Sequence, residues 1–176
     1  MSPSYWTQQW QESFKQIDDL LNYLNLSREA VSALDHNSDL PLRVPRAFAD
    51  RIEKGNPNDP LLKQILPLSQ ELDAVAGFTN DPLAENDSNQ LPGLLHKYKS
   101  RVLLTLSGAC AVHCRYCFRR HFPYSENNPG TKGWEPVFEY LTHHPEVKEV
   151  ILSGGDPLSV DDSLLENFIQ RLEHVS

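Results

Sequence analysis

Three cysteines, Cys110, Cys114 and Cys117, lie within eight residues of one another, and the 176-residue chain has no others. Their C-x3-C-x2-C spacing would let one short loop bring three thiolates to one point. Three neighbouring thiols cannot all pair in disulfides, and such a group is typical of a metal or redox site. Thiolates are the preferred ligands of iron–sulfur clusters. A four-iron cluster held by three of them leaves one iron open to bind and reduce a small molecule.

Other kinds of cysteine site compete with this interpretation. A structural zinc site needs four ligands, so it would have to recruit His113 or His121, and zinc modules usually bring their ligands as two separated pairs. Catalytic or resolving thiols would need only one or two cysteines, and buried structural cysteines would have no reason to cluster. The spacing therefore favours an iron–sulfur cluster, with a non-enzymatic metal-binding interaction module as an alternative.

A second stretch that could bind a ligand is GGDP at residues 154–157. The glycine pair Gly154 and Gly155 would let a ligand approach the backbone closely, because neither residue carries a side chain. Asp156 could accept a hydrogen bond from an ammonium group. The same four residues are also compatible with an ordinary turn, and that alternative stays open.

Positive charge gathers around the cysteines, although the chain as a whole has a net charge of −8. No Asp or Glu lies between Asp87 and Glu126, whereas six basic residues and three histidines do: Lys97, Lys99, Arg101, Arg115, Arg119, Arg120, His96, His113 and His121. Beside the cysteines this favours a pocket for small anions over a solvated charged face. The overall negative charge argues against a general nucleic-acid or membrane-surface binder.

The elements that would position these residues form a βαβα pattern. Short apolar runs at 101–106 and 149–152 predict two buried strands, and amphipathic segments at 134–143 and 161–172 predict helices. Right-handed crossovers make such strands parallel. Because ligand sites lie at the carboxyl ends of parallel strands, we expect the cysteine loop and GGDP to face one cavity.

The N-terminal part of the chain is predicted to be helical. Trp6, Trp10, Phe14, Ile17, Leu21 and Leu24 recur at helical spacing, which predicts one face of a helix or of two short helices packed in a core. Further helices are predicted from Ser27 to Leu34, from Pro45 to Gly55, and from Asp59. The segment 78–92 is predicted to be a connecting loop. This divides the chain into a helical region with its loop, 1–92, and an α/β region, 93–176.

The location expected from the sequence is cytoplasmic. No segment approaches the roughly 18 apolar residues of a membrane helix, and the first residues have no apolar region for export. Two βα units cannot close a barrel, which normally needs about 250 residues. The expected fold is therefore α/β, with N-terminal helices followed by the first units of a truncated (β/α) barrel.

The cysteine loop resembles the radical S-adenosylmethionine (SAM) superfamily, in which C-x3-C-x2-C carries an aromatic residue before the last cysteine, here Tyr116. The resemblance implies that Cys110, Cys114 and Cys117 hold a 4Fe-4S cluster whose open iron binds SAM. It also implies that Gly154, Gly155, Asp156 and Pro157 form the loop that binds the amino group of SAM.

Longer stretches are similar to the lysine 2,3-aminomutase family: PGLLHKYKSRVLL, CRYCFRRHFPY, DPLAE, LRVPRAF and GNPNDPLLKQ. Within this family the chain is most similar to members that make (R)-β-lysine for attachment to elongation factor P. The family uses pyridoxal phosphate (PLP) as well as SAM. By position, Arg119 matches the arginine that holds the substrate carboxylate, and Tyr98 and Arg101 match contacts to PLP.

The resemblance implies a PLP-dependent isomerase that moves an amino group between neighbouring carbons of L-lysine. An electron donor protein would be a partner, a homo-oligomer is compatible with the sequence, and nucleic acid and membranes are not expected partners. The family's PLP-bearing lysine lies beyond residue 176, so residues 1–176 alone are expected to be inactive. The alternatives are a radical SAM enzyme acting on another amino acid or without PLP, and the metal-binding interaction module.

Overall fold

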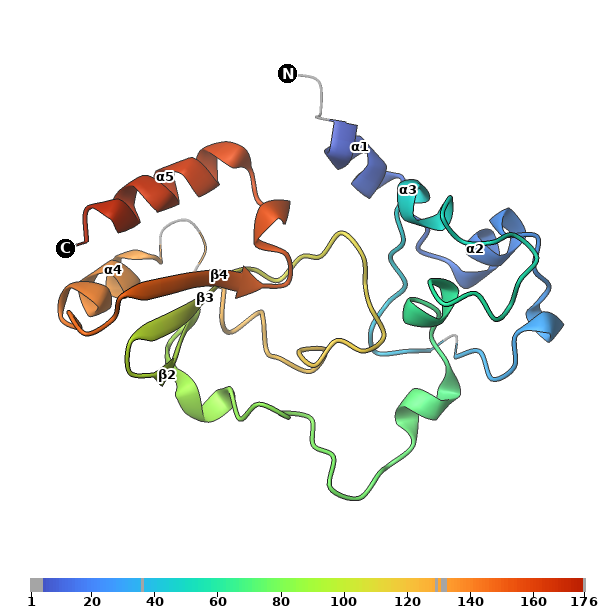
Figure 1. Cartoon of the computed structure of the whole chain (residues 1–176), viewed down its shortest axis with the longest axis horizontal. Coiled ribbons are helices and arrows are strands. Elements are labelled where there is room, and N and C mark those ends of the chain that lie inside the picture. Colours follow the sequence, from blue (N-terminus) through green and yellow to red (C-terminus); the bar gives the residue numbers. More distant parts are fainter. Residues whose placement is uncertain (1–4, 36, 129, 131–132, 176) are drawn as a thin grey trace. The chain divides into compact units, whose positions relative to one another are not determined.

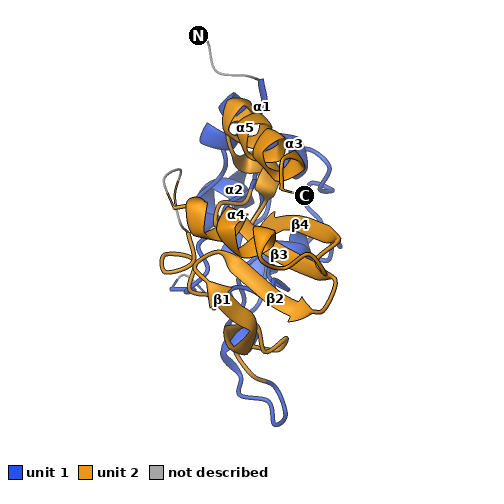
Figure 2. Ribbon diagram, turned by 90° about the vertical axis from the view of Figure 1, so that its left-hand side faces the viewer, with its two compact units in different colours: residues 1–78, 111–120 blue, residues 79–110, 121–176 orange. Residues whose placement is uncertain are grey.

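The computed structural model describes residues 5–35, 37–128, 130 and 133–175. The chain forms two compact units, coloured separately in Figure 2. Unit 1 consists of residues 1–78 and 111–120, and unit 2 consists of residues 79–110 and 121–176. The chain thus passes between the units inside the cysteine loop. The division into a helical region with its loop, 1–92, and an α/β region, 93–176, stays a prediction.

Unit 2 is built on a four-stranded sheet in the order β1-β2-β3-β4. Figure 1 labels β2, β3 and β4, and Figure 2 labels β1 as well. Its strands are β1 (Asn89–Leu91), β2 (Leu94–Tyr98), β3 (Arg101–Ser107) and β4 (Glu149–Gly154). The pair β3 and β4, at one end of the sheet, is parallel, which confirms the predicted arrangement of these two strands. The pairs β1–β2 and β2–β3 are antiparallel.

The strands β1 and β2 were not predicted from the sequence. The three residues of β1 lie inside the segment expected to be a loop, and their sequence, NQL, has no apolar alternation. Such a strand forms because its backbone groups pair with β2, and local side-chain preference contributes little. The hairpin pairs with the edge of β3 opposite to β4.

Two helices accompany the parallel strands, as predicted. The helix α4 (Glu135–Thr142) lies between β3 and β4 in the chain, and α5 (Asp162–Glu173) follows β4. The Asp161 side chain accepts a hydrogen bond from the Ser163 backbone N–H at 2.9 Å, so it caps the start of α5. Strands and helices share one apolar core: Leu94, Val102, Leu104, Leu106, Trp134, Val137, Phe138, Leu141 and Phe168. The fold is mixed α/β and is consistent with part of a radical SAM βα architecture.

The described residues of unit 1 form three short helices, α1 (Tyr5–Gln11), α2 (Ile17–Tyr23) and α3 (Arg46–Ala49). Single 3-10 turns, η1 (Arg28–Ala30), η2 (Leu62–Gln64) and η3 (Ser69–Leu72), connect longer irregular segments. A buried core joins them: Phe14, Ile17, Leu20, Leu21, Leu24, Leu26, Leu42, Val44, Ala49, Ile52, Leu62, Ile65 and Leu66. In the described part of the chain, no helix has both the length and the apolar character needed to cross a bilayer.

Several helices expected in unit 1 are shorter than the sequence indicated. The segment from Ser27 forms only η1, the helix after Pro45 ends at Ala49, and the segment after Asp59 forms only η2. Nucleating a short helix costs conformational entropy and gains few hydrogen bonds, so tertiary packing decides how long the helix is. Trp6, predicted to lie in the core, is 40% exposed.

Candidate metal and cofactor site

Cys110 lies just beyond the end of β3, in a segment tied by its backbone to the loop after β4. The Gly155 N–H donates to the carbonyl oxygen of Ser107, and the Asp156 N–H donates to that of Ala109, both at 2.7 Å. The Ala109 N–H donates in turn to the Ser107 hydroxyl at 3.0 Å. Within unit 2 the structure therefore brings Cys110 and the GGDP stretch together. That the whole cysteine loop and GGDP face one cavity stays a prediction.

The two glycines of GGDP are required by this close approach. Gly154 has φ +113°, and a Cβ built on it would lie 2.3 Å from the carbonyl oxygen of Ser107. A Cβ on Gly155 would lie 2.4 Å from the carbonyl oxygen of Ala109 and 2.9 Å from Cys110 Sγ. Real side chains do not tolerate such distances. Because neither glycine has a side chain, the backbone of Ser107 and Ala109 can approach this closely. The sequence did not specify this contact.

Asp156 has a structural partner of its own. Its Oδ1 accepts a hydrogen bond from the Leu158 N–H at 3.0 Å and so caps the 3-10 turn η5 (Pro157–Ser159). The Ser159 hydroxyl lies 2.6 Å from the Asp156 carbonyl oxygen and 3.1 Å from the Ser107 hydroxyl. Ser107 and Ser159 were not predicted to take part in this contact. The signal in the sequence was a hydroxyl residue beside each of the two loops that follow the strands.

Cys114 and Cys117 belong to unit 1 and lie on one turn. The Cys117 N–H donates to the carbonyl oxygen of Cys114 at 3.2 Å, and the Arg120 N–H donates to that of Cys117 at 3.3 Å. Two backbone bonds attach the segment to earlier residues, His113 N–H to Arg43 O at 3.1 Å and Arg115 N–H to Gln64 O at 2.8 Å. None of the three cysteines, all of which are described and partly exposed, forms a disulfide.

His113 is held by its side chain as well. Its Nδ1 lies 2.7 Å from the Pro41 carbonyl oxygen, which can only accept, so Nδ1 is the donor. Burial lowers the pKa of His113, and the nearby Arg43 and Arg115 cations lower it further, against the effect of the Pro41 bond. The imidazole therefore helps to fix the loop through Nδ1.

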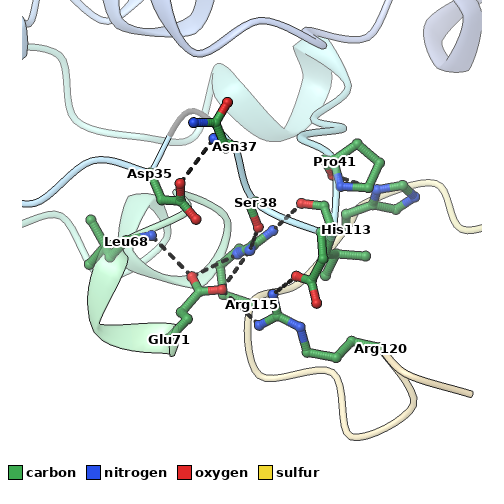
Figure 3. Close-up of polar contacts among 11 residues, drawn as sticks. Asp35, Asn37, Ser38, Pro41, Leu68, Glu71, His113, Arg115 and Arg120 are labelled. Carbon is green, nitrogen blue, oxygen red and sulfur yellow. Dashed lines mark hydrogen bonds and ion pairs between the residues drawn. The ribbon is translucent and has the colours of Figure 1, made fainter. Parts of the chain in front are cut away.

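Two arginines of the basic segment are neutralised by acids of unit 1 (Figure 3). Arg115 forms an ion pair with Glu71, and Arg120 forms ion pairs with Glu71 and Asp39. Burial would raise the pKa of Glu71, but hydrogen bonds from Arg115, Arg120 and the Leu68 N–H outweigh it and hold the pKa below its usual value. These two arginines hold the loop in place, and their positive charge is already matched by the two acids.

The other residues assigned by resemblance have different surroundings. Arg119 is buried, with its guanidinium carbon 4.9 Å from the centre of the Phe118 ring. Tyr98 and Arg101 face each other as partners of β2 and β3, and Arg101 Nε lies 3.0 Å from Glu149 Oε2. Arg101 begins β3 whereas Cys110 follows its end, so about 20 Å of strand separates them. Their roles at PLP and substrate stay predictions.

The donor set fits an iron–sulfur cluster in type and number. Three thiols occur without a fourth cysteine, and Cys114 and Cys117 already share one turn. Among the described residues no group of three or more His, Cys, Asp and Glu side chains is gathered closely enough to hold a metal ion. Convergence of all three thiolates on one cluster therefore stays a prediction from their spacing.

Comparison with known proteins agrees with this chemistry. A protein-family model described as "4Fe-4S single cluster domain" matches residues 99–175. An L-lysine 2,3-aminomutase of Escherichia coli is 46% identical over 172 residues, which are 97% of this chain and 50% of that protein. The Haemophilus influenzae protein of the same name is 50% identical over 134 residues, 76% of this chain and 40% of that protein. The L-lysine 2,3-aminomutase of Clostridium subterminale is 32% identical over 172 residues, which are 97% of this chain and 41% of that protein.

These findings define the chain first as an iron–sulfur protein of the radical SAM class. It belongs, more narrowly, to the lysine 2,3-aminomutase family. The chain spans about half the length of the curated relatives that it matches.

Proposed function

We propose that this chain is part of a radical SAM, PLP-dependent aminomutase that converts L-lysine to (R)-β-lysine. The observation that carries the proposal is the 46% identity to a protein named L-lysine 2,3-aminomutase over 97% of the chain. The alignment spans 172 of the 176 residues, so it includes the stretch with the three cysteines. The match therefore covers the predicted site as well as the scaffold.

Lysine 2,3-aminomutases use a 4Fe-4S cluster, SAM and PLP. When bound, these groups supply the radical and the support for the migrating nitrogen, and the protein orients them. In this proposal Cys110, Cys114 and Cys117 ligate the cluster through their thiolates. The Asp156 carboxylate accepts a hydrogen bond from the amino group of SAM. The planar guanidinium of Arg119 holds the substrate carboxylate by two parallel hydrogen bonds.

Two further parts of the proposal concern the cell. The product would be attached to elongation factor P, and reducing equivalents would come from an electron donor protein. A cytoplasmic location fits both partners and would keep the three thiols reduced. The similarity of CFRRHFPY, residues 117–124, to the members that modify elongation factor P supports this part.

The experiment is an anaerobic assay of the natural full-length protein. The protein is reconstituted with iron and sulfide and incubated with L-lysine, SAM, PLP and a chemical reductant, and β-lysine is measured by chiral chromatography. We expect one 4Fe-4S cluster per chain and β-lysine formation, both lost in Cys114→Ala. Arg28→Ala, which breaks an exposed ion pair with Asp18, is the matched control and should remain active.

The assay also separates the alternatives. Conversion of another amino acid in preference to lysine, or turnover that does not need PLP, would identify a different radical SAM enzyme. Zinc as the only metal in anaerobically prepared protein would identify the interaction module. Residues 1–176 assayed alone should form no β-lysine, and turnover equal to that of the full-length protein would contradict this part of the proposal.

A further inference from the structure

Arg115 lies between two predicted cluster ligands, yet its side chain points away from solvent and is only 6% exposed. Its Nε donates to Glu71 Oε1 at 2.9 Å and its Nη2 to Glu71 Oε2 at 2.5 Å. Nη1 donates to the Leu40 carbonyl oxygen at 2.7 Å, and Nη2 also donates to the Ser38 hydroxyl at 2.6 Å. The guanidinium is thus bound on both of its outer edges to residues 38–71.

Glu71 receives a second arginine from the same loop. Arg120 Nη1 donates to Glu71 Oε2 at 2.7 Å, and Arg120 Nη2 pairs with Asp39. The Leu68 N–H donates to Glu71 Oε1 at 3.1 Å, which fixes the carboxylate to its own turn, η3. One carboxylate therefore ties together a residue before Cys117 and a residue after it (Figure 3).

Arg115 is the better satisfied of the two arginines. All three of its guanidinium nitrogens have partners, whereas the buried Arg120 Nε has no hydrogen-bond partner among the described residues. A buried ion pair gains net energy only when its geometry is good and its remaining donors are satisfied. The Arg115–Glu71 pair meets this condition, so it should order the loop more strongly than the Arg120 pairs.

The Arg115–Glu71 pair orders the part of the loop that carries two of the predicted cluster ligands. A cluster held by three thiolates in one short loop loses a ligand whenever that loop opens. Arg115 follows Cys114 directly and stands two residues before Cys117, so its side chain fixes the backbone that carries both thiols. Holding ligands in place before the metal binds reduces the entropy that must be lost on binding.

We propose that Glu71 is a positioning residue for the iron–sulfur cluster. Through Arg115 and Arg120 it holds the turn of Cys114 and Cys117 in a conformation that retains the cluster. This gives the N-terminal residues 38–71 a role in metal retention. The inference rests on the proposed three-cysteine cluster.

The test measures cluster retention, with the full-length protein reconstituted anaerobically. An iron chelator is added well below the unfolding temperature, and the loss of cluster absorbance near 400 nm is followed in wild type, Glu71→Gln and Arg115→Lys. We expect Glu71→Gln to lose its cluster about tenfold faster than wild type, the factor that about 1.4 kcal/mol produces. Arg115→Lys should be intermediate, because an ammonium keeps the charge and loses the two-point contact. The electron paramagnetic resonance spectrum of the reduced cluster should change in both.

Two controls separate positioning from general stability. Asp18→Asn breaks the exposed pair with Arg28 in the same unit and should retain the cluster as wild type does. Leu24→Ala removes a fully buried core side chain outside the network, so it should lower the unfolding temperature and leave cluster loss nearly unchanged. If Leu24→Ala accelerated cluster loss as much as Glu71→Gln at an equal fall in unfolding temperature, the effect would be general stability and the proposal would be wrong.

The outcomes also distinguish this inference from the proposed function. Iron uptake that is equal in wild type and Cys114→Ala would refute the cluster itself. A wild-type cluster that Glu71→Gln retains at the wild-type rate would refute only the positioning role. Should Glu71→Gln fail to fold, Asp39→Asn, which changes the second acidic partner of Arg120 and leaves Glu71 in place, should still give a smaller acceleration. Retention at the wild-type rate in both Asp39→Asn and Arg115→Lys would overturn the proposal.

Discussion

The backbone N–H of Asp156 donates a hydrogen bond to the carbonyl oxygen of Ala109, with an N···O distance of 2.7 Å. This bond joins the residue before Cys110 to the predicted SAM-binding loop. The carboxyl ends of the parallel strands β3 and β4 are thereby connected directly, without an intervening side chain.

Gly155→Ala should disturb Cys110 in particular. The added methyl group would meet the Ala109 carbonyl oxygen and Cys110 Sγ, so the cysteine segment would have to move. We expect a lower iron content after reconstitution and a loss of stability of about 1 to 3 kcal/mol. Gly77→Ala is the control, because Gly77 has open space around it and only its φ of +86° resists a side chain. Its cluster content should equal that of wild type.

Asp156 has two functions that two substitutions should separate. Asp156→Asn keeps an oxygen that can accept from the Leu158 N–H, whereas Asp156→Ala removes the cap as well as the charge. We expect both variants to bind SAM more weakly by about 1.5 to 3 kcal/mol, the contribution of a hydrogen bond to a charged group. Only Asp156→Ala should also lower the unfolding temperature. Wild-type SAM affinity in Asp156→Asn, measured by calorimetry on the reconstituted protein, would assign this residue to the turn alone.

Arg119→Lys should impair turnover of the full-length enzyme. An ammonium group cannot reproduce the planar two-point contact of a guanidinium with a carboxylate. We expect KM for lysine to rise about tenfold or more, with cluster content unchanged. The matched control is Arg28→Lys at an exposed ion pair of unit 1. Unchanged kcat and KM in Arg119→Lys would show that this buried arginine has a packing role instead.

The stability of unit 1 should fall in acid because of Asp59. Burial would raise the pKa of Asp59, but hydrogen bonds from the backbone N–H groups of Glu53, Leu62 and Leu61 outweigh it and lower the pKa. The folded state therefore binds the proton more weakly than the unfolded state does. The stabilisation that the Asp59 carboxylate provides is complete above its unfolded-state pKa of about 4. It is lost as the pH falls through the lower pKa of the folded state.

Asp59→Ala should accordingly reduce the free energy of unfolding at neutral pH by about 1 to 2 kcal/mol. It should also flatten the dependence of stability on pH below about 4. Urea unfolding between pH 3 and pH 7 checks both, with Asp73→Ala, at an exposed position of the same unit, as the control. An Asp59→Ala variant with the wild-type slope in acid would contradict this account.

Much of unit 2 could be predicted from the sequence because its signals are local. The apolar runs of β3 and β4 and the periodicity of α4 and α5 specify these elements without distant contacts, and the structure confirms all four. Unit 1 was predicted less well. Of the residues with helical spacing, Ile17 and Leu21 are buried in α2, whereas Phe14 is buried in an isolated bridge with Val44. The segments after Ser27 and Asp59 fold as single turns. Their lengths depend on the core they join and on caps such as Asp59, so propensity along the chain could not fix them.

The sequence by itself determined the chemistry: three thiols at C-x3-C-x2-C spacing, and a glycine pair with an acid after a parallel strand. Residue type and spacing carry that information, because the ligands of one loop must be close in the chain. Only the tertiary structure decided that Gly155 makes room for Ala109, and that Arg115 and Arg120 converge on Glu71. Glu71 precedes Arg115 by 44 residues, and which acid neutralises a buried arginine depends on how the intervening chain folds back. No periodicity or local motif encodes a contact of that kind.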